Sequence, residues 1–231
     1  MMPTHPTAAQ VLDLLVETLA RHSNFSMNDN REIRRLRPKV SNVERGADIV
    51  RQGDRPKLAI MVVSGMLARY HTAPNGDRQY LSLHIAGDLP DLQSLFLGIM
   101  DHSVCALDET QIAAFAHSEI QSLVRRAPSA GLAFWRHTLI DAAIFRQAIT
   151  SNGRRSAVAR VAHLFCEQFT RARAALCVRL VLPVSTQPDA NRAGSRSITA
   201  DHPQGNSIST QRGLRRGSQW NATHSQLAAS E

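Results

Sequence analysis

Apolar and polar positions alternate near the middle of the chain, where residues 81–86 read Leu-Ser-Leu-His-Ile-Ala. This period of two residues predicts a half-buried β-strand. Short runs rich in valine, isoleucine, leucine and tyrosine recur between residues 46 and 87, and glycine-bearing turns separate them. Asn75-Gly76-Asp77 has the composition of a hairpin turn, because asparagine and glycine tolerate positive φ. Together these features predict a small antiparallel sandwich or barrel over residues 40–115.

Helical periodicity flanks this predicted sheet on both sides. We expect amphipathic helices over residues 9–21 and 28–37, the second capped by Asn28 or Asp29. A sequence of capping-box form at Ser118 predicts a short helix to about residue 125. The longest predicted helix spans 128–150 and ends at Ser151-Asn152-Gly153, and a further helix follows over 154–169.

Three motifs occur in a fixed order along the predicted sheet. Residues 46–54 have the form Gly-x-x-Ile-x-x-x-Gly-Asp, residues 62–67 the form Val-x-x-Gly-x-Leu, and Gly87-Asp88 ends a strand. No single motif is specific, but their order and spacing resemble the Crp/Fnr family of bacterial transcription regulators over residues 25–180. The resemblance implies an α+β protein, in which an antiparallel β-roll of the cyclic nucleotide-binding type (a jelly roll) precedes a long dimerisation helix and a winged helix-turn-helix.

The resemblance also implies a division of the chain into domains. The β-roll with its N-terminal helices takes residues 1–125, and the dimerisation helix takes 126–152. The start of the winged helix-turn-helix takes 153–184, and a tail covers 185–231.

The long helix carries more apolar surface than one small β-roll needs to cover. One stripe consists of Leu132, Trp135, Leu139 and Ala142, and an adjacent stripe of Ile140, Ile144 and Ala148. The helix either packs back onto its own roll or pairs with the same helix of a second subunit. Its length and the family resemblance favour a homodimer with the first stripe as the interface.

The family places its ligand after the Gly-Asp pair. There a glutamate accepts a hydrogen bond from the ribose, and an arginine pairs with the cyclic phosphate. In this chain Asp91 lies near the glutamate position, and His102 takes the place of the arginine. The candidate effector-binding residues implied by the resemblance are Gly87, Asp88, Asp91, His102 and Ser103.

These substitutions argue against cyclic AMP. A histidine is mostly neutral at pH 7 and cannot make the bidentate guanidinium contact. Asp101 adds negative charge beside it, and Pro90 removes an amide donor. Two interpretations remain: His102 and Asp101 are plain loop residues, or they recognise a different, unknown effector.

The family pattern stops near residue 184. Residues 154–169 match the helix that opens the winged helix-turn-helix, with Arg154 and Arg155 either contacting phosphate or forming a solvated face. Residues 185–231 lack helical periodicity and a recognition-helix pattern. They are either a disordered basic tail or an out-of-frame translation. In both cases we expect DNA binding by this chain to be weak or non-specific.

Composition narrows the remaining functions. A net charge of +8 favours a polyanionic partner such as DNA, although an arginine-rich coding bias has the same effect. The three cysteines lack metal-type spacing, so we expect no cofactor or metal, and free thiols in a reducing cytoplasm. No signal peptide or membrane span is expected.

An enzyme is not expected, because consecutive residues such as Asp101, His102 and Ser103 rarely face one site. The sequence therefore predicts a cytoplasmic transcription regulator that senses an unknown effector. The alternative is an effector or protein interaction module that does not bind DNA.

Overall fold

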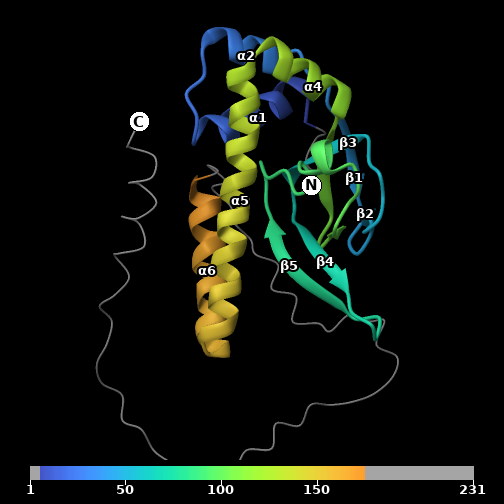
Figure 1. Cartoon of the computed structure of the whole chain (residues 1–231), viewed down its shortest axis with the longest axis vertical. Coiled ribbons are helices and arrows are strands. Elements are labelled where there is room, and N and C mark those ends of the chain that lie inside the picture. Colours follow the sequence, from blue (N-terminus) through green and yellow to red (C-terminus); the bar gives the residue numbers. More distant parts are fainter. Residues whose placement is uncertain (1–5, 175–231) are drawn as a thin grey trace, which may run out of the picture. The chain divides into compact units, whose positions relative to one another are not determined.

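A computed structural model describes residues 6–174 of the 231-residue chain. The predicted turn into the helix-turn-helix at 179–184 and the tail at 185–231 lie outside the described residues. Helices α1 (Ala8–Ala20) and α2 (Met27–Ile33) precede the sheets, and the short α3 (Ser94–Leu97) lies between two strands. Three helices follow the sheets: α4 (His117–Arg126), α5 (Pro128–Arg154) and α6 (Ala157–Ala174) (Figure 1).

Within residues 6–174, seven strands form two antiparallel sheets, which confirms the predicted β-roll. One sheet has the order β1-β7-β3, and the other has the order β2-β6-β4-β5. The bounds are β1 (Lys39–Val43), β2 (Asp48–Val50), β3 (Leu58–Ser64), β4 (Leu67–Thr72), β5 (Arg78–His84), β6 (Ser103–Ala106) and β7 (Thr110–Ala116). The hairpin between β4 and β5 turns at Gly76, whose φ of 84° suits glycine. Asn75 Oδ1 accepts the Asp77 N–H at 3.1 Å in the same turn.

β3 contributes to the two larger hydrophobic clusters of the described residues. Ile60 and Val62 face the four-stranded sheet, where they pack in a cluster with Leu67 and Val104. The opposite side of β3 belongs to a larger cluster with β7 and helices α1, α4 and α5. That cluster includes Val11, Leu15, Leu19, Ala59, Met61, Phe115, Ile120, Leu123 and Phe134. Because β3 is covered on both sides, its interior positions 59–62 are all buried and do not alternate.

Two predicted helix starts need correction. The N-cap of α2 is Ser26, not Asn28 or Asp29, and Asp29 instead closes a capping box with Ser26. The predicted capping box at Ser118 does not form, because α4 already begins at His117 with Ala116 as N-cap. Glu119 accepts the main-chain N–H of Arg37 at 3.3 Å instead.

The long helix is longer than predicted. It continues through Gly153 and ends at Arg154, with Arg155 extended as its C-cap. Gly153 has no positive φ and is exposed, so it does not terminate the helix here. The break falls at Ser156, whose Oγ accepts the Ala159 N–H at 3.3 Å in the first turn of α6.

Candidate effector site

The turn after β5 begins at Gly87, and its conformation depends on close contact with α1. Gly87 has a φ of 94°, and a β-carbon there would collide with the hydroxyl of Thr18. The Gly87 N–H donates to the Val62 carbonyl at 2.8 Å, which ties the turn to β3. Gly87 thus shapes the turn through its backbone.

Asp88 is engaged by its own chain. Its Oδ2 accepts the N–H of Ile85 at 2.8 Å and forms an ion pair with Arg171 of α6. The Arg171 guanidinium also donates to the Leu83 carbonyl at 3.0 Å and lies 3.4 Å from Glu167 Oε1. The Gly-Asp pair therefore connects the end of β5 to α6.

Asp91 lies beneath the turn with no exposed surface. Its Oδ1 accepts the N–H of Ile60 at 2.7 Å, and its Oδ2 has no hydrogen-bond partner among the described residues. Burial raises the pKa of Asp91 to about 7, against the opposing effect of the Ile60 hydrogen bond. A carboxyl in this position faces the core of the roll.

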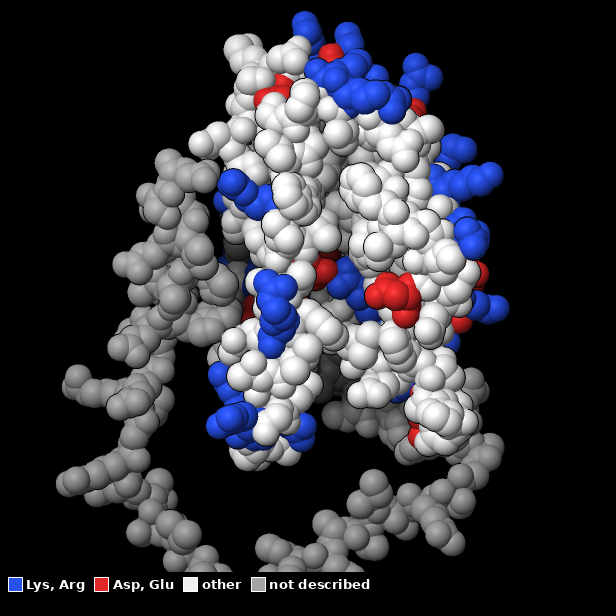
Figure 2. All heavy atoms as spheres, in the orientation of Figure 1, with Lys and Arg blue, Asp and Glu red and all other residues white. Residues whose placement is uncertain are grey.

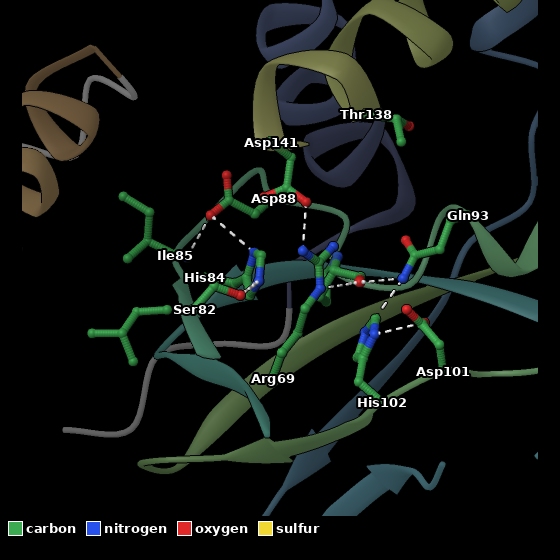
Figure 3. A network of polar contacts seen from close by, with 12 residues as sticks. Arg69, Ser82, His84, Ile85, Asp88, Gln93, Asp101, His102, Thr138 and Asp141 are labelled. Atoms are coloured by element: carbon green, nitrogen blue, oxygen red, sulfur yellow. Dashed lines mark hydrogen bonds and ion pairs between the residues drawn. The ribbon is translucent and has the colours of Figure 1, made fainter. Parts of the chain in front are cut away.

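His102 is buried, and both of its ring nitrogens have partners. Nδ1 lies 2.8 Å from Asp101 Oδ1, and Nε2 lies 3.3 Å from the side-chain nitrogen of Gln93 (Figure 3). Because an amide nitrogen can only donate, His102 Nε2 accepts and the ring is neutral. Burial and then the charge of Arg69 lower the pKa of His102, while Asp101 opposes them. Ser103 starts β6 and accepts the Gln52 N–H at 3.0 Å.

The five predicted site residues lie close to one turn, but their described polar contacts are with the chain itself. Arg69 lies at the centre of the site, and it is not one of the residues that the sequence motifs predicted. Arg69 of β4 donates from Nε to the Pro90 carbonyl at 2.7 Å and from Nη1 to Asp141 Oδ2 of α5 at 2.5 Å (Figure 3). One sequence signal was available, since Arg69 interrupts the otherwise apolar run Met66-Leu67-Ala68-Arg69-Tyr70.

Two more histidines lie at the boundary between the roll and the helices. His84 of β5 is buried, and its Nε2 lies 2.9 Å from Ser82 Oγ. Burial lowers the pKa of His84 well below its ordinary value, with a further contribution from the charge of Arg69. Burial likewise lowers the pKa of His137 on α5. Both rings are therefore neutral at pH 7.

Hollows of different size lie between the roll and the helices. A cavity of about 40 Å³ is lined by His84, Asp88, Leu89, His137, Asp141, Ile144 and Arg171. Pockets for drug-sized ligands usually have volumes of about 300–1,000 Å³. A second hollow of about 310 Å³ lies along α5 and α6, with Leu81, Ala148 and Leu164 among its lining residues. The smaller cavity, next to Asp141 and Arg171, has no room for a nucleotide in this conformation.

Different sides of α5 have different surroundings, and Ile140, Ile144 and Ala148 of the second predicted stripe are half-buried. Ala130, Ala133 and Phe134 are buried against the roll and its neighbouring helices. Leu132, Trp135 and Leu139 of the predicted interface are 60%, 61% and 49% exposed, and Ala142 is half-buried. Figure 2 shows this largely uncharged face.

Basic side chains gather at both ends of α5 in Figure 2. Arg154 and Arg155 are exposed at its C-terminal end. No group of three or more His, Cys, Asp or Glu side chains suited to a metal ion occurs within residues 6–174. In the same part of the chain, no helix is long and apolar enough to cross a bilayer.

Comparison with known proteins places the fold. The family model of the cyclic nucleotide-binding domain matches residues 40–127. The structure of FixK2 from Bradyrhizobium japonicum matches with a TM-score of 0.54 and 20% identity, over 59% of this chain and 68% of that chain. The N-terminal domain of a transcriptional regulator from Streptomyces coelicolor A3(2) matches with a TM-score of 0.45 and 22% identity, over 59% and 94%.

A cyclic nucleotide-binding domain from Methylobacillus flagellatus matches with a TM-score of 0.48 and 17% identity, over 77% of this chain and 89% of that chain. No curated protein sequence matches the chain. Residues 40–127 thus match the cyclic nucleotide-binding domain. The chain has the cyclic nucleotide-binding-like fold that its motifs predicted.

Proposed function

We propose that this protein is a transcription regulator of the Crp/Fnr type that senses an effector other than cyclic AMP. The observation that carries the proposal is the course of α5. This helix of 27 residues packs one side on the roll and presents a second, apolar side to solvent, and it leads directly into α6. A change in the roll can therefore alter both the contacts of α5 and the position of α6.

The dimer is part of this proposal. Leu132, Trp135 and Leu139 lie at helical spacing on one exposed side of α5, so a second copy of the same helix can cover them. A two-fold axis along α5 would bring two rolls and two α6 helices together, which suits a palindromic DNA site.

DNA binding by this chain is proposed to be weak and non-specific. Exposed arginines at the end of α5, including Arg154 and Arg155, supply contacts to phosphate. The sequence after residue 184 has no recognition-helix pattern that would contact base edges. Binding then depends mainly on counterion release, with a dissociation constant of about 10⁻⁴–10⁻⁶ M and a steep dependence on salt.

A competition binding assay tests the proposal. The full chain is titrated with a palindromic operator duplex selected with an intact relative, and with scrambled DNA of equal length. We expect equal affinities that fall together as salt rises, and a weaker salt dependence for Arg154→Ala/Arg155→Ala. A hundredfold preference for the operator would contradict the proposed loss of specificity. Absence of any DNA binding at low salt would favour an interaction module without DNA binding.

A further inference from the structure

Arg69 reaches from β4 into the region where the roll meets α5. Its Nε donates to the Pro90 carbonyl, and its Nη1 donates to Asp141. Within the described residues, its Nη2 group makes no hydrogen bond. A guanidinium offers two parallel N–H groups that match a carboxylate or a phosphate. Asp141 accepts from Nη1, and Nη2 is left to donate to another group.

One further side-chain donor, Gln93, lies close to Arg69 and also contacts His102. The side-chain nitrogen of Gln93 lies 3.4 Å from the Pro90 carbonyl oxygen that also accepts from Arg69. Figure 3 shows Gln93 and Arg69 pointing toward this carbonyl from opposite sides, with Asp141 above Arg69. The turn thus brings an amide donor and a guanidinium together at a site that is mostly shielded from water, since the Arg69 side chain is 11% exposed.

Asp141 has room to move. Asp141 lines the cavity of about 40 Å³ together with Arg171 and His137. A volume of this size accommodates water molecules or a rotated side chain. A carboxylate displaced from Arg69 would therefore remain close to another cation, which reduces the cost of breaking its first ion pair.

We propose that Arg69 binds the anionic group of the effector, and that Asp141 occupies this position when the effector is absent. The ligand class is a small carboxylate or phosphate anion, because Arg69 is only 11% exposed and the cavity next to its partner Asp141 has a volume of about 40 Å³. This inference rests on the proposed sensing function and names its ligand. Since Asp141 belongs to α5, the anion and the helix compete for one guanidinium, and binding releases a link between roll and helix.

Calorimetric titration of the full chain with inorganic phosphate and with succinate tests the assignment. Asp141→Asn removes the internal competitor, and we expect one of the two anions to bind about tenfold or more tightly than to the wild type, a change of about 1.4 kcal/mol. The double variant Arg69→Gln/Asp141→Asn should lose this binding, and Arg69→Lys/Asp141→Asn should retain only part of it. The two titrants distinguish phosphate from carboxylate recognition.

Asp13→Asn is the matched control, because Asp13 pairs with Arg34 at 2.6 Å on the exposed surface. This variant should bind both anions as the wild type does. Equal anion affinity of Asp141→Asn and the wild type would overturn the inference, as would undiminished binding by Arg69→Gln/Asp141→Asn. Circular dichroism of each variant identifies loss of folding, and the comparison of Asp141→Asn with Asp13→Asn does not depend on the Arg69 variants.

A cyclic AMP titration of Asp141→Asn completes the design. Tighter binding of cyclic AMP than of phosphate and succinate would overturn the small-anion assignment. The DNA competition assay distinguishes this failure from failure of the proposed function, because DNA binding by the wild type does not depend on which anion Arg69 accepts.

Discussion

Asp88 and Arg171 form an ion pair that attaches α6 to the end of the roll. Their side chains are 16% and 19% exposed, so water screens the pair only in part. Asp88 also accepts the N–H of Ile85, and Arg171 also donates to the Leu83 carbonyl. A residue of the Gly-Asp motif therefore holds the helix that follows the predicted dimerisation helix.

Arg171→Met should destabilise the docked position of α6. The change removes a charged hydrogen-bond donor from Asp88, and we expect a loss of about 2 kcal/mol in unfolding free energy. Urea denaturation measures the loss, and hydrogen exchange should show faster exchange of the α6 amides. Arg34→Met is the control, because its pair with Asp13 is 45% and 50% exposed and should contribute less than about 1 kcal/mol. Equal effects of the two substitutions would contradict this role of Arg171.

Asp91 should make stability depend on pH. Its pKa is raised from an ordinary value of 3.8 to about 7 in the fold, so the folded protein binds a proton that the unfolded chain releases. The contribution of Asp91 is fully present below about pH 4 and is lost as the pH rises through about 7, with a slope of up to about 1.4 kcal/mol per pH unit.

Asp91→Asn isolates this contribution, because the amide oxygen still accepts the N–H of Ile60. The lowered pKa values of His84, His102 and His137 act in the opposite direction. Because the fold holds these side chains neutral, the folded protein becomes more stable as the pH rises toward 6.5, the ordinary pKa of histidine. The difference between wild type and Asp91→Asn, measured by urea denaturation from pH 4 to pH 8, should shift in favour of the variant as the pH rises. A difference that is constant over this range would contradict the prediction.

The exposed stripe of α5 should mediate a dimer. Leu139→Glu places a charge at the proposed seam and should produce monomers, which sedimentation velocity at micromolar concentration detects. Met27→Glu is the control, because Met27 is 93% exposed on α2, away from this stripe. A wild-type protein that sediments as a monomer would contradict the proposed dimer.

Cyclic AMP should not bind to the unaltered chain at physiological concentrations. His102→Arg alone should restore little affinity, because Pro90 and Asp101 remain and the cavity next to Asp141 stays small. Calorimetry of both proteins checks this expectation. Micromolar affinity of the wild type for cyclic AMP would show that the turn opens much further than the structure describes.

The roll was predictable because its signals are local. Each glycine-bearing turn, each alternating strand and each of the three motifs spans only a few residues. The family resemblance then combined these local signals into one predicted fold. The polar centre of the site was not predictable in this way. Arg69 and Asp141 are 72 positions apart, and Asp88 and Arg171 are 83 positions apart. Such pairs follow no period, and only the packing of α5 and α6 on the roll brings them together.

The start of α2 shows a local signal that was misinterpreted. Ser26 and Asp29 have the spacing of a capping box, and the serine begins the helix two residues before the predicted cap at Asn28. Gly153 was predicted to end the long helix, but the helix continues through it to Arg154. A glycine near a helix end does not by itself stop the helix. Composition alone did not distinguish these cases.

The contact of Gly87 with Thr18 indicates that the sensor domain includes α1 and so begins before residue 40. The matched region starts at residue 40, yet α1 lies against the turn of the candidate site and contributes Val11, Leu15 and Leu19 to the interior. A fragment of residues 40–127 keeps α4 but lacks α1 and α5, so part of the apolar cluster on the β1-β7-β3 sheet would be exposed, and an exposed apolar face of this kind promotes aggregation. The smallest recombinant sensor worth preparing therefore includes α1 together with its cap, Thr7.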